Sequence, residues 1–227
     1  MDSKARVPSW PKLHAILFDW DGTLLDSYES HLRVYRRVLA HFGMTLDEQD
    51  YIRHYSPNWY TFYERLGLHP RWWEKADRLW LQYNAAERPP LRRNARFILE
   101  QLQIRGFLLG LVTAGDRRRV LQDLRRLDLR GSFQVVVCGG DVKVRKPDPG
   151  PLLHALAQLD VAPSHAAYVG DTPEDVEMGK RAGVFTVAVL GGFGLRESLE
   201  AVSPDLLIPS LEELLKVFEA TPPPTGS

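Results

Sequence analysis

The sequence predicts an α/β protein in which a Rossmann-like parallel sheet carries helices on both faces and a small all-α domain is inserted after the first strand. Short apolar runs alternate with helical patterns over most of the chain, as in proteins built from βαβ units. The runs are continuous rather than alternating, which is typical of strands buried on both faces. From about Tyr28 to Arg93, by contrast, no convincing strand is found.

The predicted strands are short apolar runs between turn signals. They are Ala15–Phe18, Leu108–Thr113, Gln134–Val137, Ala166–Val169, Thr186–Leu190 and Leu206–Ile208. Helical patterns follow most of them, at Ala95–Arg105, Asp116–Leu127, Pro149–Leu159, Pro173–Ala182 and Leu211–Glu219. Because a predicted helix lies between each successive pair of the first five strands, these strands can be joined in parallel by crossover connections.

The segment without strands is aromatic and basic. Its breaks lie near Gly43, Ser56-Pro57, Gly67 to Pro70 and Pro89-Pro90, which predicts about four helices. The proline pair marks the return to the sheet. We therefore expect a catalytic core domain formed by residues 1–27 and 93–227 and a helical cap domain formed by residues 28–92.

Composition limits the classes of partner. The 227 residues carry a formal net charge of zero, which gives no reason to expect a nucleic-acid or membrane partner, and no obligate protein partner is evident. The single cysteine, Cys138, ends an apolar run and is expected to be a buried small hydrophobe. Residues 1–12 lack the apolar core of a secretory signal, no apolar stretch could span a bilayer, and residues 221–227 are expected to be frayed. We expect a cytoplasmic protein.

Polar clusters follow the strands at the points where parallel strands end. They are Asp19-Trp20-Asp21-Gly22-Thr23, Thr113-Ala114-Gly115, Lys146-Pro147-Asp148-Pro149 and Gly170-Asp171-Thr172. In an open parallel sheet, ligands bind at the carboxyl ends of the strands. The four clusters are therefore expected to meet at one edge, where they bring carboxylates, a hydroxyl and a lysine together.

This constellation resembles the haloacid dehalogenase superfamily, and within it the phosphatases with a helical cap, such as phosphoglycolate phosphatases and β-phosphoglucomutase-like proteins. The specific part is Asp-x-Asp-Gly-Thr-Leu-x-Asp-Ser at residues 19–27. A threonine at a strand end, Lys-Pro-x-Pro and Gly-Asp-Thr-x-x-Asp follow in the family's order. The resemblance extends from about Leu13 to Leu215.

The chemistry follows from the repulsion between a carboxylate and an anionic phosphate ester. A divalent cation can bridge the two, and Mg²⁺ prefers oxygen ligands. The resemblance implies that Asp19 is the nucleophile that forms an aspartyl-phosphate, and that Asp21 is the general acid and base. It also implies that Mg²⁺ is held by Asp19, the backbone carbonyl of Asp21 and Asp171. Thr113, Lys146 and backbone N–H groups near Ala114 would bind the phosphoryl oxygens.

Three further residues have more than one interpretation. Asp175 fits a capping box with Thr172, and the resemblance also gives it a supporting place near the metal; both roles can hold. His31 is either a histidine on a helix surface or, as in β-phosphoglucomutase-like relatives, a helper of the acid–base group. Arg53 is a candidate contact from the cap to an anionic substrate.

The leading hypothesis is a magnesium-dependent phosphatase that acts on a small phosphorylated metabolite. A β-phosphoglucomutase would transfer the phosphoryl group to a sugar instead of water, and His31 is its one hint. A haloacid dehalogenase usually lacks the second acid, so Asp21 argues against that activity. A phosphate-binding or regulatory module without catalysis is the last alternative. Specificity is expected to depend on the cap.

Overall fold

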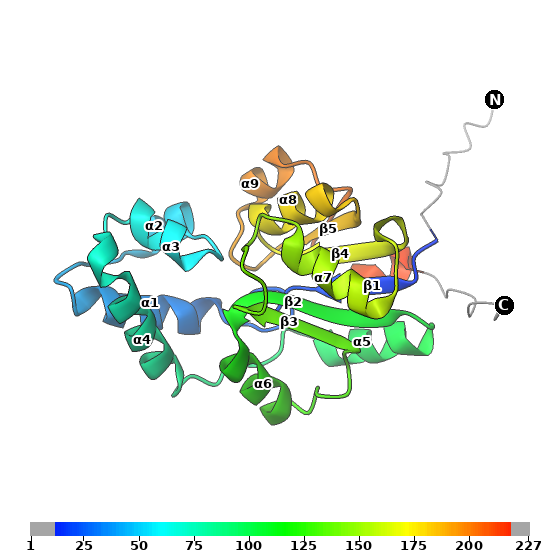
Figure 1. Cartoon of the computed structure of the whole chain (residues 1–227), viewed down its shortest axis with the longest axis horizontal. Coiled ribbons are helices and arrows are strands. Elements are labelled where there is room, and N and C mark those ends of the chain that lie inside the picture. The colour runs from blue at the N-terminus through cyan, green and yellow to red at the C-terminus, as the bar shows by residue number, and fades with distance from the viewer. Residues whose placement is uncertain (1–11, 219–227) are drawn as a thin grey trace.

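A six-stranded sheet runs through the described part of the protein, which in this computed structural model comprises residues 12–218 (Figure 1). The expectations for the first residues and for the tail at 221–227 lie outside it, except for Lys12. The strand order is β3-β2-β1-β4-β5-β6, and every neighbouring pair is parallel. The strands are β1 (Ala15–Phe18), β2 (Leu108–Asp116), β3 (Val135–Gly139), β4 (Ala166–Gly170), β5 (Phe185–Val189) and β6 (Leu206–Ile208).

Helices cover both faces of this sheet, which confirms the predicted fold class. One face is covered by α5 (Ala95–Ile104), α6 (Arg117–Arg126) and α10 (Leu214–Val217). The other is covered by α7 (Gly150–Leu159) and α8 (Pro173–Ala182), with α9 (Arg196–Ala201) beside α8. Short 3₁₀ turns lie at η2 (Pro163–His165) and η3 (Leu211–Glu213).

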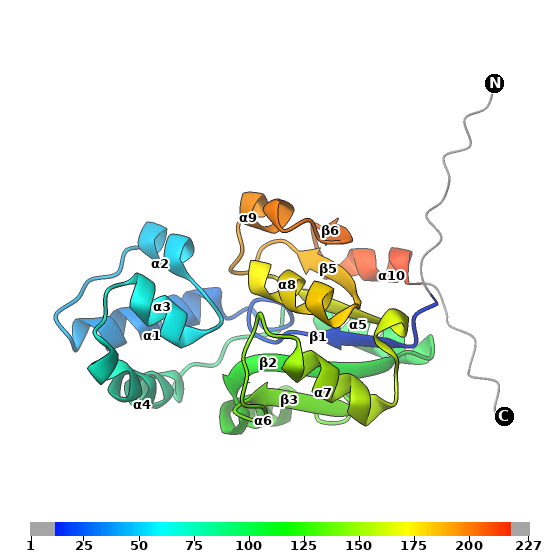
Figure 2. The same ribbon diagram turned by 45° about the horizontal axis from the view of Figure 1, so that its top comes forward.

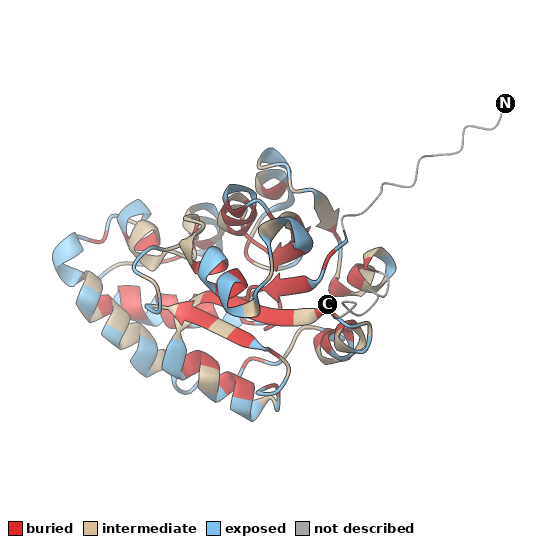
Figure 3. Cartoon of the chain, turned by 45° about the vertical axis from the view of Figure 1, so that its right-hand side comes forward, coloured by how far each residue is buried: buried red, intermediate tan, exposed pale blue. Residues whose placement is uncertain are grey.

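The central strand β1 shows why continuous apolar runs were needed. Ile16 and Phe18 pack into the cluster beneath α5 and α6, whereas Ala15 and Leu17 pack into the cluster beneath α7 and α8. All four residues are inaccessible to solvent, and Figure 3 shows the sheet as the most continuously buried part of the fold. A strand between two helical layers buries successive side chains on opposite faces.

Four helices and a 3₁₀ turn lie between β1 and α5. They are α1 (Tyr28–Ala40), α2 (Glu48–His54), α3 (Trp59–Arg65), η1 (Pro70–Trp72) and α4 (Trp73–Asn84). They enclose an aromatic-rich core of their own, and Figures 1 and 2 both place them beyond one end of the sheet. We interpret this group as the cap expected over residues 28–92 and call it the cap.

The two connections to the cap lie side by side. Leu25 and Leu91 form an isolated bridge. The backbone N–H of Asp26 donates to the carbonyl of Pro90 at 2.9 Å, and that of Arg92 donates to Leu24 at 2.8 Å. The proline pair therefore does mark the return from the cap.

Element boundaries differ from the prediction in a few places. β2 continues to Asp116, whose carboxylate caps α6, so that helix begins one residue later than expected. The helix expected at 211–219 is divided into η3 and α10, because Leu211 and Leu214 are three residues apart, a spacing that a 3₁₀ turn also satisfies. The six residues of α9 are too few to give a periodic signal.

Two expectations from composition can be compared with the structure. Cys138 is 3% exposed within the core cluster beneath α5 and α6, and burial raises the pKa of its thiol to about 12, as expected of a buried small hydrophobe. Among the described helices, none has the length and apolar character needed to cross a bilayer.

Gly110 in β2 allows the sheet to pack tightly, which gives a first prediction. It pairs with Leu17 on one side and Val135 on the other, and an added Cβ would lie 2.9 Å from both side chains. We expect Gly110→Ala to lower the free energy of unfolding by about 1–3 kcal/mol through overpacking, measured by urea denaturation. Gly131→Ala is the matched control, since no atom lies within 4 Å of its added Cβ. Equal stability of the two variants would contradict this account.

Candidate active site

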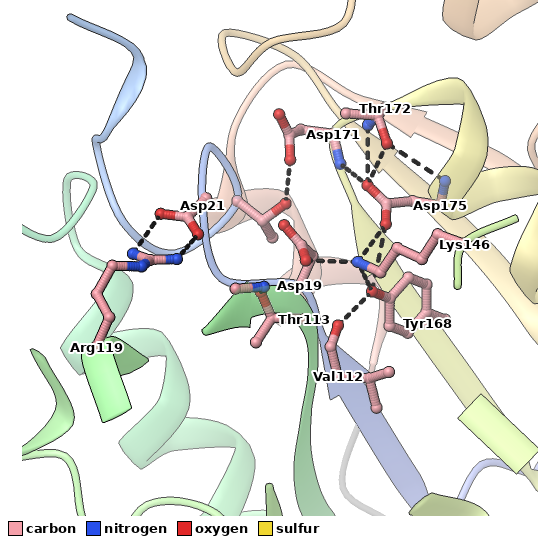
Figure 4. Close-up of polar contacts among 12 residues, drawn as sticks. Asp19, Asp21, Val112, Thr113, Arg119, Lys146, Tyr168, Asp171, Thr172 and Asp175 are labelled. Atoms are coloured by element: carbon pink, nitrogen blue, oxygen red, sulfur yellow. Dashed lines mark hydrogen bonds and ion pairs between the residues drawn. The ribbon is translucent and has the colours of Figure 1, made fainter. Parts of the chain in front are cut away.

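The predicted polar clusters meet at the carboxyl edge of the sheet (Figure 4). Asp19 follows the central strand β1, Thr113 lies near the end of β2, and Asp171 follows β4. Since β2 and β4 flank β1, their ends are adjacent. Lys146 and Asp175 join them from the β3–α7 connection and from α8, and all five residues are buried.

Lys146 is the hub of this site. Its ammonium Nζ donates to Oδ1 of Asp19 at 2.5 Å, to Oδ1 of Asp175 at 2.7 Å and to the hydroxyl of Tyr168 at 2.8 Å. Tyr168 in turn donates to the backbone carbonyl of Val112 at 2.8 Å, which ties the site to β2. All three hydrogens of the ammonium therefore have acceptors, as a fully buried lysine requires.

The carboxylate of Asp171 is fixed by hydrogen bonds to both of its oxygens and by closely packed loops. Its Oδ1 accepts from the hydroxyl of Thr23 and its Oδ2 from the backbone N–H of Phe193, both at 2.7 Å. An added Cβ would lie 2.3 Å from Oδ2 at Gly22 and 2.1 Å at Gly192. The loops after β1 and β5 can therefore close on this carboxylate only because these two residues have no side chain.

Asp175 completes the predicted capping box and also contacts Lys146 in the charged cluster. Its Oδ2 accepts from the backbone N–H of Thr172 at 3.1 Å, while the Thr172 hydroxyl accepts from the Asp175 N–H, so the capping box at the start of α8 is complete. Its Oδ1 binds Lys146. The residue thus starts a helix and supports the charged cluster with different oxygens.

Three carboxylates surround the single lysine. One oxygen each of Asp19, Asp171 and Asp175 lie within 4.8 Å of one another. Burial and the Asp175 charge raise the pKa of Asp171 to about 7. Burial also raises the pKa of Asp19, with further increases from Asp175 and Asp171 that Lys146 offsets only in part. The cluster has more acidic oxygens than one ammonium can balance, so its donors fit a divalent cation.

Asp21 points to the other side of Asp19 and has different partners (Figure 4). The guanidinium of Arg119 binds both of its oxygens, with 3.0 Å between Nη1 and Oδ1. Nε2 of His31 lies 3.3 Å from Oδ1. Burial would raise the pKa of Asp21, but the charges of Arg119 and His31 outweigh it and hold this pKa well below its usual range. His31 is therefore not a surface histidine, since it is 5% exposed and beside the second acid.

Arg119 was missed by the sequence analysis. It is the third of three consecutive arginines, and only Arg119 is buried while Arg117 and Arg118 are exposed. Helical spacing could have identified it as buried. Arg119 precedes the buried Val120 and lies one turn before the buried Asp123, so it is on the inner face of α6.

A chamber of about 280 Å³ lies between this edge and the cap. Asp19, Asp21, Thr113, Ala114 and Arg119 line its floor. The cap contributes a wall that is mainly aromatic, with His31, Tyr35, Trp59, Tyr63, Asp77 and Trp80. The aromatic residues of the cap therefore form its core and also face the site.

Among the candidate residues, Arg53 lies away from both the chamber and the carboxylate cluster. It lies on α2 with a side chain that is 70% exposed and lines a separate groove between the cap and α8. At the edge of that groove, the hydroxyl of Ser56 donates to Glu174 at 2.8 Å, a direct contact between cap and core.

Phe193 makes a second contact between cap and core. Its backbone N–H binds Asp171, while its ring belongs to the hydrophobic cluster of the cap. The ring stacks on Tyr55 with 4.2 Å between centroids and lies 5.5 Å from that of His31.

Comparison with known proteins agrees with this geometry. The profile of haloacid dehalogenase-like hydrolases matches residues 16–189. The chain belongs to this family. Phosphoglycolate phosphatase of Synechococcus elongatus is 33% identical to this hydrolase over 211 residues, which are 90% of this chain and 96% of that protein. Pyrophosphatase PpaX of Bacillus velezensis is 32% identical over 213 residues, 91% of this chain and 96% of that protein.

A solved structure shows the same fold. CbbY from Rhodobacter sphaeroides, in complex with phosphate, superposes on this hydrolase with a TM-score of 0.78 and 25% identity, over 89% of this chain and 96% of that one. With relatives of these activities, the protein is a phosphatase of the haloacid dehalogenase-like family.

The charge balance around Lys146 gives a second prediction for this hydrolase. Lys146→Met leaves Asp19 and Asp175 buried without their cation, so we expect the free energy of unfolding to fall by about 3–5 kcal/mol in the presence of EDTA at pH 8. Urea denaturation measures the change. The exposed Lys143 provides the control Lys143→Met. If both variants lost the same small amount of stability, Lys146 would not be the balancing charge.

Proposed function

We propose that this protein is a magnesium-dependent phosphatase that hydrolyses a small phosphorylated metabolite through an aspartyl-phosphate on Asp19. The observation that carries the proposal is the position of Asp19, buried between Lys146 and two further carboxylates on the floor of the chamber. Its carboxylate is the one acidic group that belongs both to the cluster of three carboxylates and to the chamber.

The metal would be held by Asp19, Asp171 and the backbone carbonyl of Asp21. When bound, Mg²⁺ neutralises the repulsion between the nucleophilic carboxylate and the phosphate ester. Lys146 and Asp175 keep the oxygens of Asp19 in place, and Thr23 with Phe193 does the same for Asp171. The chain thus supplies oriented oxygen donors before a cation arrives.

The reaction begins with attack of Asp19 on phosphorus. Thr113 and the backbone N–H groups near Ala114 line the chamber, and Lys146 lies beside Asp19. In this scheme they bind the transferring phosphoryl group and stabilise the charge that its oxygens carry in the transition state. Water then attacks the phosphorus of the aspartyl-phosphate, so that Asp19 is regenerated and phosphate is released.

Asp21 is the general acid and base of this scheme. It lines the chamber on the side away from the carboxylate cluster, where a leaving group would lie. It gives a proton to the leaving oxygen in the first step and takes one from water in the second. His31, 3.3 Å from its Oδ1, is placed to steady the carboxylate.

The substrate class follows from the enclosure. A chamber of about 280 Å³ holds a small metabolite and excludes a folded phosphoprotein. The two relatives are a phosphoglycolate phosphatase and a pyrophosphatase, and phosphoglycolate and pyrophosphate are both compact phosphorylated compounds. We therefore propose a phosphoglycolate-like phosphate ester as the substrate. The cytoplasmic location stays a prediction.

A β-phosphoglucomutase is the second candidate, and the contact between His31 and Asp21 is the observation that favours it. A matched lysine from the cap does not line the chamber in the described part of the chain. Hydrolysis is therefore the better supported fate of the phosphoryl group. Because Asp19, Asp21 and Thr113 line one chamber and Lys146 binds Asp19 beside it, a module without catalysis is the weakest interpretation.

An aryl phosphate assay tests the proposed function. We expect phosphate release from p-nitrophenyl phosphate with Mg²⁺ and none with EDTA. Asp19→Asn removes the nucleophile and should lower kcat by roughly a thousandfold or more. Asp26→Asn changes an exposed carboxyl in the same segment and should keep the activity. An inactive wild type with Mg²⁺, or an active Asp19→Asn variant, would sink the proposal.

The pKa of Asp171 gives a prediction for metal binding. A proton and Mg²⁺ compete for this carboxylate, whose pKa is raised to about 7, so the metal binds better as the pH rises through 7. We expect roughly tenfold tighter binding at pH 8 than at pH 6, with release of a proton at the lower pH. Calorimetry in buffers of different ionisation enthalpy measures both quantities. An affinity that is the same at pH 6 and pH 8 would contradict it.

A further inference from the structure

Arg119 occupies the leaving-group side of the chamber. It rises from the first turn of α6 and binds both oxygens of Asp21. Phosphorus must lie against Asp19, so the bridging oxygen of a phosphate ester and the group beyond it must lie near Asp21 and Arg119. Arg119 is therefore positioned to contact the leaving group of the substrate.

The pair cannot persist unchanged through the reaction. To pass a proton to the leaving oxygen, Asp21 must offer it a carboxyl oxygen, yet Arg119 engages both oxygens in a two-pronged ion pair. A contact of this kind holds the acid in one orientation, away from a new partner. Proton transfer therefore requires that Asp21 separate from the guanidinium of Arg119.

Separating Asp21 from Arg119 is unfavourable, because water has too little access to the guanidinium to replace the lost carboxylate. The side chain of Arg119 is 9% exposed, and its remaining carboxylate contact is Asp123 at 3.5 Å. Its guanidinium carbon lies 5.6 Å from the ring centre of Trp80, and an added Cβ at Gly115 would lie within 2.5 Å of its Nη2. An enclosed guanidinium that leaves one carboxylate needs another anion in its place.

We propose that Arg119 binds a carboxylate on the leaving group of the substrate, and that this exchange frees Asp21 for proton transfer. In the structure, the Asp21 carboxylate binds the edge of the Arg119 guanidinium that the carboxylate of the substrate would bind during the reaction. The planar fork that fits one carboxylate fits the other in the same two-pronged manner. This inference rests on the proposed function and deepens it, because it makes Arg119 the residue that selects acidic phosphate esters over neutral ones.

The chain length of the substrate follows from the same geometry. Asp21 and Asp19 are two residues apart, and Arg119 reaches the acid from the floor of the same chamber. A carboxylate that takes the place of Asp21 must therefore be a few bonds from phosphorus. Arg145 also lines the chamber, but it lies against the cap, with its guanidinium carbon 4.2 Å from the ring centre of Trp59.

A matched pair of unreactive ligands tests the proposal. 3-Phosphonopropionate and propylphosphonate share a phosphonate and a three-carbon chain, and only the first ends in a carboxylate. Each is measured with Mg²⁺ as a competitive inhibitor of p-nitrophenyl phosphate hydrolysis and titrated by calorimetry. We expect the wild type to bind the carboxylated ligand roughly tenfold or more tightly than its partner, as a charge-assisted contact allows.

Substitution at Arg119 should remove this preference selectively. In Arg119→Met the ratio of the two affinities should fall to near one, while the affinity for propylphosphonate changes little. Arg119→Lys keeps the charge without the fork and should give an intermediate ratio. Arg118→Met, the same substitution on the exposed neighbour, should keep the wild-type ratio.

The outcomes separate the two proposals. A ratio near one in the wild type, or a wild-type ratio retained in both Arg119 variants, would overturn the role of Arg119 even if the protein hydrolyses aryl phosphate. An equal loss of affinity for both ligands would show a role in general site structure and would also overturn it. If aryl phosphate is not hydrolysed, the proposed function fails, and the calorimetric ratio still decides the role of Arg119.

Discussion

A buried lysine among carboxylates is the constraint on which the rest of the site depends. Lys146 fixes Asp19 and Asp175 with hydrogen bonds of 2.5 and 2.7 Å, yet it leaves an excess of negative charge once Asp171 is included. Such a cluster is stable only if protons or a cation complete its balance. The same imbalance that costs stability in the free protein therefore makes the site receptive to a metal cation, whose charge would in turn allow the anionic oxygens of a phosphoryl group to approach.

The order of the strands in the sheet places the residues of this cluster next to one another. Because β1 lies between β2 and β4, residues more than a hundred positions apart end at one edge. The cap then closes over that edge, and its two connections run side by side through Leu25 and Leu91. The core thus holds the proposed reacting groups while the cap supplies the opposite wall of the chamber, a division under which the cap could vary without disturbing the carboxylate cluster.

Much of the site could be predicted because its residues lie in short motifs directly after apolar strands. Asp19, Thr113 and Asp171 were found in this way, and their convergence required only a parallel sheet. Arg119 was not found, since it stands among three consecutive arginines and only the phase of α6 separates it from them. No local pattern decides the role of His31 or the position of Arg53, because both depend on how the cap docks.

Phe193 has a mechanical consequence for the cycle of this enzyme. Its ring is seated among the cap aromatics while its backbone N–H holds Asp171. Any displacement of the cap that moved this ring would also move the donor that holds the Asp171 carboxylate. The packing of the cap and the orientation of a proposed metal ligand are therefore coupled through a single residue.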